Sequence, residues 1–145
     1  MATTANTIQV LQRVPLFQGL NSRQLGKLAE RCIERKFPTG QSMVTQGYGG
    51  EGFYVIVSGK AEAIRERADG VKVVVNTFGP TDFFGELALL DDGPRTATVI
   101  ASEATECLAL TRWDFLGVLQ QDADMAVLVL QELARRFRTA LDALQ

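Results

Sequence analysis

The chain has 145 residues, of which 46% are hydrophobic and 22% charged, a balance typical of one globular domain large enough for a hydrophobic core. Fifteen basic and 17 acidic residues give a net charge of −2, so no overall positive field would attract the chain to nucleic acid. The absence of histidine excludes histidine general bases and histidine-ligated metal or haem sites, and two cysteines are too few for a four-thiolate iron–sulfur cluster.

Membrane and export signals are missing from the sequence. The longest unbroken apolar run, from Met125 to Leu130, has six residues, far fewer than a bilayer span requires. The N-terminus MATTANTIQV lacks the basic start and apolar stretch of a signal peptide. Cys32 and Cys107 fall in apolar stretches and are interpreted as small buried side chains, not as a disulfide or a metal pair. We therefore expect a cytoplasmic protein without membrane insertion.

Residues 1–34 are predicted to form an N-terminal helical part. Asn21 and Gln24 have the spacing of a capping box, and apolar residues then recur with the period of a helix. These apolar positions are Leu25, Leu28, Ala29 and Cys32. The pattern predicts a helix from about Ser22 to Glu34.

Residues 35–110 have the punctuation of an all-β segment. Ten glycines divide them into short stretches rich in Val, Ile, Phe, Tyr and Thr, the pattern of an antiparallel sandwich or roll. Ala68-Asp69-Gly70, between KAEAIRER and VKVVVNTF, predicts a hairpin turn.

Helical periodicity returns over residues 111–145. Thr111 is a candidate cap for a short helix carrying Trp113, Leu116 and Leu119, and Asp122 for a longer helix to about Leu144. The longer helix has a heptad stripe, suited either to packing on the β segment or to pairing with a second copy. The stripe consists of Ala126, Leu130, Leu133, Phe137, Ala140 and Leu144.

The stretch FFGELALLDDGPRTATVIA, residues 83–101, has the layout of a site for a sugar phosphate. Gly85 allows close backbone approach, and the amides of Glu86, Leu87 and Ala88 open what is predicted to be a one-turn helix whose N-terminus favours an anion. Arg95, at the start of a β-like run, would add a planar cationic fork suited to phosphate. Glu86 would be repelled by a phosphate, but it could accept a hydrogen bond from a ribose hydroxyl.

The chain resembles the cyclic nucleotide-binding domain family of catabolite-activator-type regulators, protein kinase A regulatory subunits and cyclic-nucleotide-gated channels. Residues 83–97 resemble its phosphate-binding cassette, and three further segments resemble its opening turn, its second and third strands and its B helix. These segments are VPLFQGL (14–20), QGYGGEGFYVIVSG (46–59) and RWDFLGVL (112–119). The resemblance implies a single α+β domain over residues 1–145, an antiparallel β-roll (double-stranded jelly roll) flanked by an N-terminal helix and two C-terminal helices.

The resemblance also implies roles for the cassette residues. Glu86 would accept the ribose 2′-hydroxyl, Arg95 would grip the cyclic phosphate, and the amides of Gly85, Ala88 and Thr96 would complete the anion cradle. The implied ligand-binding set is Gly85, Glu86, Leu87, Ala88, Arg95, Thr96 and Ala97. Either charged residue without the other would be better explained as an ordinary surface group.

Two further groups are supporting candidates. Glu51 stands where the family commonly has an acidic partner for the arginine, usually aspartate, and the alternative is a solvated turn glutamate. Arg136 and Phe137 fall about where a lid residue would contact the base, although Phe137 is also a candidate core residue.

The function implied is a ligand-gated regulatory module, not an enzyme, because the site offers a carboxylate and an arginine but no evident pair of nucleophile and base. The ligand would be a 3′,5′-cyclic nucleotide, with cyclic AMP slightly favoured over cyclic GMP and no cofactor or metal. Since the sequence stops at Gln145, before any helix-turn-helix, we expect no direct nucleic-acid binding and an effector in a separate protein or a missing domain. The alternative is a ligand-free roll that serves as an interaction or oligomerisation scaffold, with a homodimer through the C-terminal helix.

Overall fold

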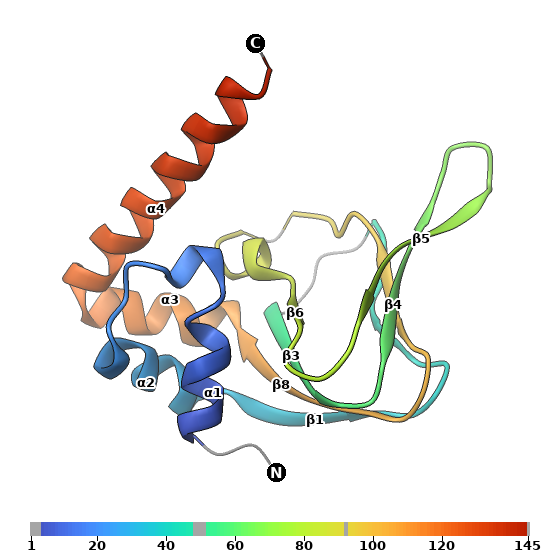
Figure 1. Cartoon of the computed structure of the whole chain (residues 1–145), viewed down its shortest axis with the longest axis horizontal. Coiled ribbons are helices and arrows are strands. Elements are labelled where there is room, and N and C mark those ends of the chain that lie inside the picture. Colours follow the sequence, from blue (N-terminus) through green and yellow to red (C-terminus); the bar gives the residue numbers. More distant parts are fainter. Residues whose placement is uncertain (1–3, 48–51, 92, 145) are drawn as a thin grey trace. The chain divides into compact units, whose positions relative to one another are not determined.

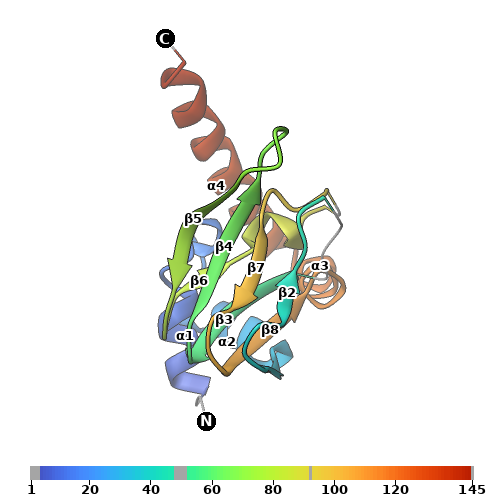
Figure 2. The same ribbon diagram turned by 90° about the vertical axis from the view of Figure 1, so that its right-hand side faces the viewer.

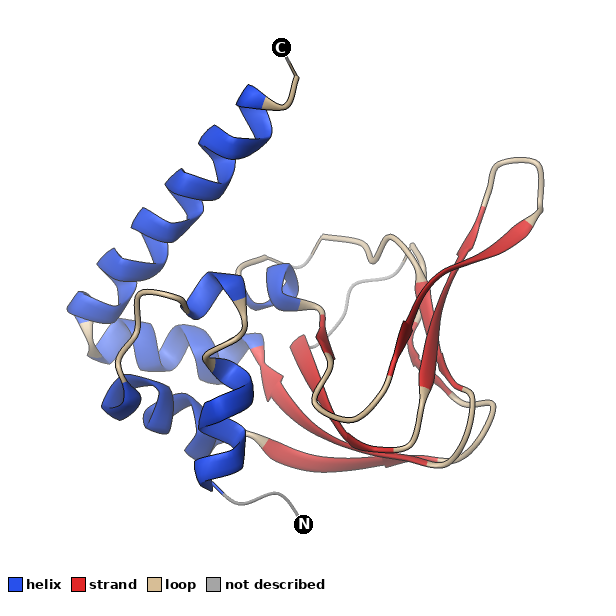
Figure 3. Ribbon diagram, viewed as in Figure 1, coloured by secondary structure: helices blue, strands red, loops and turns tan. Residues whose placement is uncertain are grey.

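The computed structural model describes residues 4–47, 52–91 and 93–144 (Figure 1). Two compact units make up the chain. One comprises residues 32–113 and holds the β-strands, and the other combines the described residues through Arg31 with those from Asp114 onward. Figure 3 shows that the strands all come from the middle of the chain and that most of the helical turns come from its two ends.

The β unit consists of two four-stranded antiparallel sheets, as the glycine-punctuated pattern predicted. One sheet has the strand order β1-β8-β3-β6 and the other has the order β2-β7-β4-β5. Figure 2 shows the four strands of the second sheet side by side. Neighbours within each sheet are mostly distant in sequence, which is the topology of a roll. The strands are β1 (Ile33–Phe37), β2 (Ser42–Val44), β3 (Gly52–Ser58), β4 (Ala61–Glu66), β5 (Lys72–Phe78), β6 (Phe83–Phe84), β7 (Thr98–Ala101) and β8 (Thr105–Thr111).

Alternate residues of the two sheets meet in one hydrophobic core, which confirms the predicted β-roll. The sheet with the order β2-β7-β4-β5 contributes three alanines to this core, whereas the other sheet contributes its two large aromatic residues, Phe37 and Tyr54. The buried members are Phe37, Met43, Val44, Tyr54, Ile56, Ala61, Ala63, Val99, Ala101, Cys107 and Ala109.

The predicted hairpin turn at Ala68-Asp69-Gly70 joins β4 to β5. The Arg67 amide donates to the Val71 carbonyl oxygen at 2.9 Å, and Gly70 adopts a φ of +85°, which only glycine takes up without strain. The hairpin extends beyond the rest of the sheet in Figure 1, and β5 forms the edge of that sheet.

The helical unit begins with a helix that the sequence pattern did not reveal, α1 (Thr4–Leu11), and a 3-10 turn, η1 (Pro15–Phe17). Helix α2 (Ser22–Arg31) has the predicted capping box. The backbone amide of Asn21 donates to Gln24 Oε1, and the backbone amide of Gln24 donates to Asn21 Oδ1, both at 2.9 Å. The prediction that this helix continues to Glu34 was wrong. Ile33 already pairs with β8, so strand formation ends the helix three residues earlier.

The two C-terminal helices are α3 (Arg112–Gln121) and α4 (Ala123–Asp142). Helix α3 buries Phe115 and Val118, whereas Trp113, one of the residues predicted to lie on this helix, is 70% exposed beneath the Arg112 guanidinium. The predicted cap of α4 is confirmed, since the Asp122 carboxylate accepts from the Met125 amide at 3.2 Å.

The packed face of α4 differs from the predicted stripe. Its fully buried residues are Met125 and Val129, while Leu130, Phe137 and Leu144 are 64%, 65% and 83% exposed. The helix ends at Asp142, not at Leu144. Because residues 125–130 are all apolar, the sequence did not reveal which side of the helix would be covered.

The prediction of two buried free cysteines is half correct. Cys107 is buried in the β-roll core, whereas Cys32, where the chain leaves α2, is only half-buried. Among the described residues, no helix has the length and apolar character to cross a membrane.

Candidate functional site

Aromatic side chains anchor the short strand that leads into the predicted cassette. Phe84 of β6 stacks on Tyr54 with ring centroids 5.2 Å apart and lies 5.0 Å from the ring of Phe78, while Phe83 packs on Phe53 at 5.8 Å. Both phenylalanines of β6 are therefore fixed by neighbouring strands. The chain turns at Gly85 directly beyond this anchor and forms the predicted one-turn helix, η2 (Glu86–Leu89), which is a 3-10 helix.

Arg95 lies half-buried beside this turn. Its Nη2 donates to the Gly52 carbonyl oxygen at 2.5 Å, and its Nε is buried without a hydrogen-bond partner among the residues that the structure describes. Burial lowers the pKa of the Arg95 guanidinium from its ordinary value, and Tyr54 opposes that shift. An arginine nevertheless stays protonated, so the site contains a partly desolvated cation that donates to a neutral carbonyl oxygen.

Gly85 is required by the arginine itself. A Cβ at this position would lie 2.6 Å from Arg95 Nη1 and 2.8 Å from the Gly52 oxygen, and the residue has a φ of +87°. We predicted that Gly85 admits a ligand close to the backbone. In the structure the same missing side chain admits the guanidinium, which places the positive charge against the turn.

The structure brings six of the seven predicted ligand-binding residues to one cavity of about 460 Å³. These six are Gly85, Glu86, Leu87, Ala88, Arg95 and Thr96. The exception is Ala97, which packs against the hydrophobic core. The β-like run predicted to open at Arg95 begins later, with β7 at Thr98.

The predicted anion cradle differs in one amide. The Ala88 amide donates to the Gly85 carbonyl oxygen at 3.1 Å within the 3-10 turn, so it would have to exchange this bond for a ligand oxygen. The role predicted for Glu86 stays a prediction. Glu51 lies outside the described residues, and the candidate lid residues Arg136 and Phe137 belong to the helical unit.

The sequence pattern missed other parts of the site. Asp91, Gly93 and Pro94 complete the cavity wall, and Asp91 accepts from the Gly93 amide at 3.1 Å, a turn that the Asp-Asp-Gly run could have suggested. Gly52, which supplies the acceptor for the arginine, gave no local signal. No cluster of three potential metal ligands occurs in the part of the chain that the structure describes.

The antiparallel roll has a cavity that combines a partly desolvated arginine with a short helical turn, an arrangement with the chemistry to hold a small anion. The chain belongs to the cyclic nucleotide-binding domain family, which it matches over residues 34–122. This match confirms the resemblance noted in the sequence.

Individual relatives include bacterial regulators and eukaryotic kinase subunits. The cyclic AMP receptor protein of Thermus thermophilus is 36% identical over 126 residues, which cover 87% of this chain and 58% of that protein. The cAMP-dependent protein kinase regulatory subunit of Aspergillus fumigatus is 38% identical over 109 residues, covering 75% of this chain and 26% of the subunit. The chain thus spans less than two thirds of the length of either relative.

Solved structures agree with this assignment. The N-terminal domain of a transcriptional regulator from Streptomyces coelicolor A3(2) has a TM-score of 0.83 and 35% identity, covering 92% of this chain and 96% of that one. The catabolite activator protein of Thermus thermophilus has a TM-score of 0.69 and 36% identity, covering 90% of this chain and 63% of that one.

Proposed function

We propose that the chain binds a 3′,5′-cyclic nucleotide in the cavity beside Arg95 and acts as a ligand-gated regulatory module without catalytic activity. The observation that carries this proposal is the half-buried guanidinium, whose Nε has no partner among the described residues. A buried cation with unused donors is costly in the empty state, and a phosphate oxygen would satisfy it.

The remaining parts of the nucleotide have candidate partners in the same cavity. Glu86, the first residue of η2, would accept the ribose 2′-hydroxyl, and the amides of Gly85 and Thr96 would face the phosphate. Cyclic AMP is the slightly favoured ligand, since the relatives described above are a cyclic AMP receptor protein and a cAMP-dependent protein kinase regulatory subunit. Thr96 suits either base, so cyclic GMP is the competing ligand.

The central experiment is a calorimetric titration of both nucleotides against the wild type and an Arg95→Met variant. Removing the fork while keeping an unbranched aliphatic stem should weaken binding by about 2 to 5 kcal/mol, because a desolvated phosphate then lacks its cation. Arg67→Met, at an exposed arginine that forms an ion pair with Asp69 on the hairpin, is the matched control and should bind as the wild type does. Equal affinity in Arg95→Met and Arg67→Met would remove the phosphate assignment.

The ribose contact has its own test. Wild-type protein should prefer the cyclic nucleotide over its 2′-deoxy form, and Glu86→Ala should lose most of that preference, by about 1 to 3 kcal/mol. If Glu86→Ala discriminates as well as the wild type, another group reads the ribose.

The output would come from α4 and from a further domain or protein. This helix exposes a heptad-spaced apolar stripe, a pattern suited to pairing with α4 of a second copy, and its lid candidates Arg136 and Phe137 would respond to the base. The apolar stripe of α4 consists of Val127, Leu130, Phe137 and Leu141.

Light scattering tests the proposed homodimer. Leu130→Glu, near the N-terminal end of the apolar stripe of α4, should convert a dimer to a monomer, whereas Gln131→Glu at the adjacent exposed position should not. A wild type that stays monomeric at high concentration would exclude the dimer but leave nucleotide binding untouched.

A further inference from the structure

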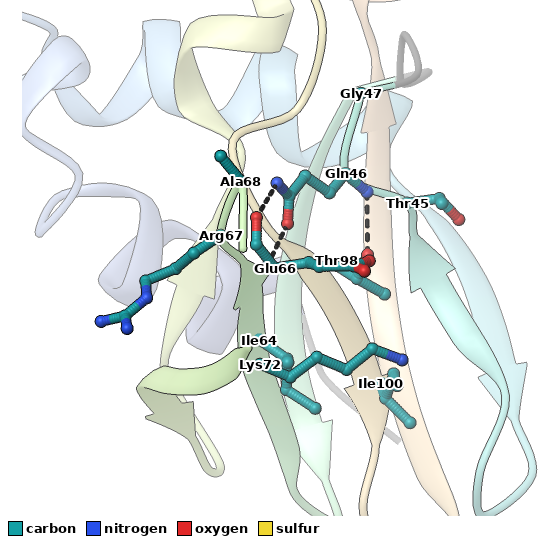
Figure 4. Close-up of a pocket in the computed structure, with 10 residues that line it drawn as sticks. All are labelled: Thr45, Gln46, Gly47, Ile64, Glu66, Arg67, Ala68, Lys72, Thr98 and Ile100. Carbon is teal, nitrogen blue, oxygen red and sulfur yellow. Dashed lines mark hydrogen bonds between the residues drawn. The ribbon is translucent and has the colours of Figure 1, made fainter. Parts of the chain in front are cut away.

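Gln46, which follows β2, acts as a substitute strand neighbour for the end of β4. Its side-chain Nε2 donates to the Glu66 carbonyl oxygen at 2.9 Å, and its Oε1 accepts from the Glu66 amide at 2.7 Å. Figure 4 shows this pair of hydrogen bonds at one wall of a depression of about 600 Å³. A single side chain thus satisfies both backbone groups of Glu66, as a paired strand would.

The backbone of the same residue holds the cassette arginine. Gln46 and Arg95 form a parallel bridge, and the next amide, that of Gly47, donates to the Arg95 carbonyl oxygen at 2.9 Å. The Gln46 amide in turn donates to the Thr98 hydroxyl at 2.9 Å, also drawn in Figure 4. Gln46 therefore links three places: the end of β4, the start of β7 and the backbone of Arg95.

These contacts continue the sheet beyond its last regular pair. The β4–β7 ladder ends where Ile64 lies opposite Thr98. Past that point Arg65 Nε donates to the Thr96 carbonyl oxygen at 3.2 Å, and Gln46 connects Glu66 to Arg95. Without these hydrogen bonds the segment that carries Arg95 would be a free strand end. Ligand binding would then have to order this segment, at a cost in conformational entropy.

We propose that Gln46 is a positioning residue that holds the Arg95 backbone in its ligand-binding conformation before any ligand arrives. The inference rests on the proposed function, because it concerns the affinity of the same phosphate site. Gln46 does not need to touch the nucleotide. It restricts the conformations of the Arg95 backbone in the free protein, so that less conformational entropy is lost when the ligand binds.

The direct test is Gln46→Met, which keeps the length of the side chain but removes both hydrogen bonds to Glu66. Cyclic AMP affinity should fall about fivefold to thirtyfold, the value of one or two neutral hydrogen bonds. Gln41→Met is the matched control. Gln41 lies just before the other end of β2, is exposed, and its side chain has no hydrogen bond among the described residues, so its replacement should leave the affinity unchanged.

A double-mutant cycle then asks whether the effect passes through the arginine. Arg95→Lys keeps the charge but loses the fork, and in that background Gln46→Met should cost less than threefold. Amide hydrogen exchange in the absence of nucleotide supplies a second readout, since the Gly47 and Glu66 amides should lose protection in Gln46→Met but not in Gln41→Met. If Gln46→Met does not fold, Thr98→Val removes the acceptor for the Gln46 amide with little change of shape, and the same losses are expected.

The outcomes separate this inference from the function on which it rests. A wild-type protein that binds neither cyclic nucleotide would overturn the proposed function. If the wild type binds, Arg95→Met does not, and Gln46→Met binds as well as Gln41→Met, the positioning role fails and the phosphate site stands. A Gln46→Met loss of the same size in the wild-type and Arg95→Lys backgrounds would also overturn the inference, because Gln46 would then act independently of the arginine.

Discussion

Replacing Gly85 by alanine probes how closely the cassette turn packs on its arginine. The new Cβ would lie 2.6 Å from Arg95 Nη1 and 2.8 Å from the Gly52 carbonyl oxygen. Both separations are shorter than the contacts that Cβ atoms make in proteins, and the oxygen belongs to the backbone. The guanidinium and the turn must therefore move apart.

Gly70 provides the matched comparison for the magnitude. It has a φ of +85°, nearly the same as the +87° of Gly85, but an added Cβ would meet nothing within 4 Å. Gly70→Ala should thus cost only the conformational strain, about 1 kcal/mol. Gly85→Ala should cost a further 1 to 3 kcal/mol or so for overpacking, and its cyclic nucleotide affinity should fall at least about tenfold as the guanidinium is displaced.

Urea unfolding and calorimetric titration of the two variants measure both quantities. The excess destabilisation of Gly85→Ala should shrink when Arg95 is also replaced by alanine, because the Nη1 contact is then gone. If the free energies of unfolding of Gly70→Ala and Gly85→Ala agree within about 0.5 kcal/mol, the packing argument is refuted. An unchanged nucleotide affinity in Gly85→Ala would also refute it.

Three further predictions concern stability and reactivity. Thr81 has a φ of +72° in the turn before β6, so Thr81→Gly should stabilise the fold by about 1 kcal/mol in urea unfolding; a loss of stability would show that the threonine side chain outweighs its strain. A hydrogen bond from Lys27 and one from a backbone amide lower the pKa of Asp122 below 3.8. Its ionised form therefore stabilises the fold above pH 3.8, that contribution is lost as the pH falls through the lowered value, and Asp122→Asn should flatten this acid-side decline in melting temperature. Burial raises the pKa of the Cys107 thiol to about 11, so at pH 8 iodoacetamide should modify Cys32 first and Cys107 only upon unfolding; comparable rates in the folded protein would contradict its burial.

The cassette was predictable because its chemistry is local. Gly85, Glu86 and Arg95 lie within eleven consecutive residues, and the turn chemistry of that stretch determines that they face one cavity. The acceptor for the arginine was not predictable in this way. Gly52 lies 43 residues earlier in the chain, and its carbonyl oxygen reaches Arg95 only because β3 pairs with β6.

The errors at the helices have the same origin in tertiary structure. The apolar periodicity predicted that α2 continues past Cys32. The pairing of Ile33 with Ala109 in the sheet outweighed that local helical preference. In α4 the apolar run from Met125 to Leu130 places apolar side chains on every side of the helix. The sequence therefore could not show that the side with Met125 and Val129 is buried and the side with Leu130 is exposed. Capping residues were read correctly at both helices because a cap depends only on its immediate neighbours.

The pairing of β1 with β8 has a consequence for how the protein is made. Ile33 lies opposite Ala109 in the sheet. About 76 further residues must therefore be synthesised after β1 before its partner strand exists. At a synthesis rate of roughly 5 to 20 residues per second, this delay lasts about 4 to 15 seconds. Contacts of such long sequence separation also slow folding itself. During that interval β1 is an unpaired edge, and truncated chains that stop before β8 should depend on chaperones to avoid aggregation.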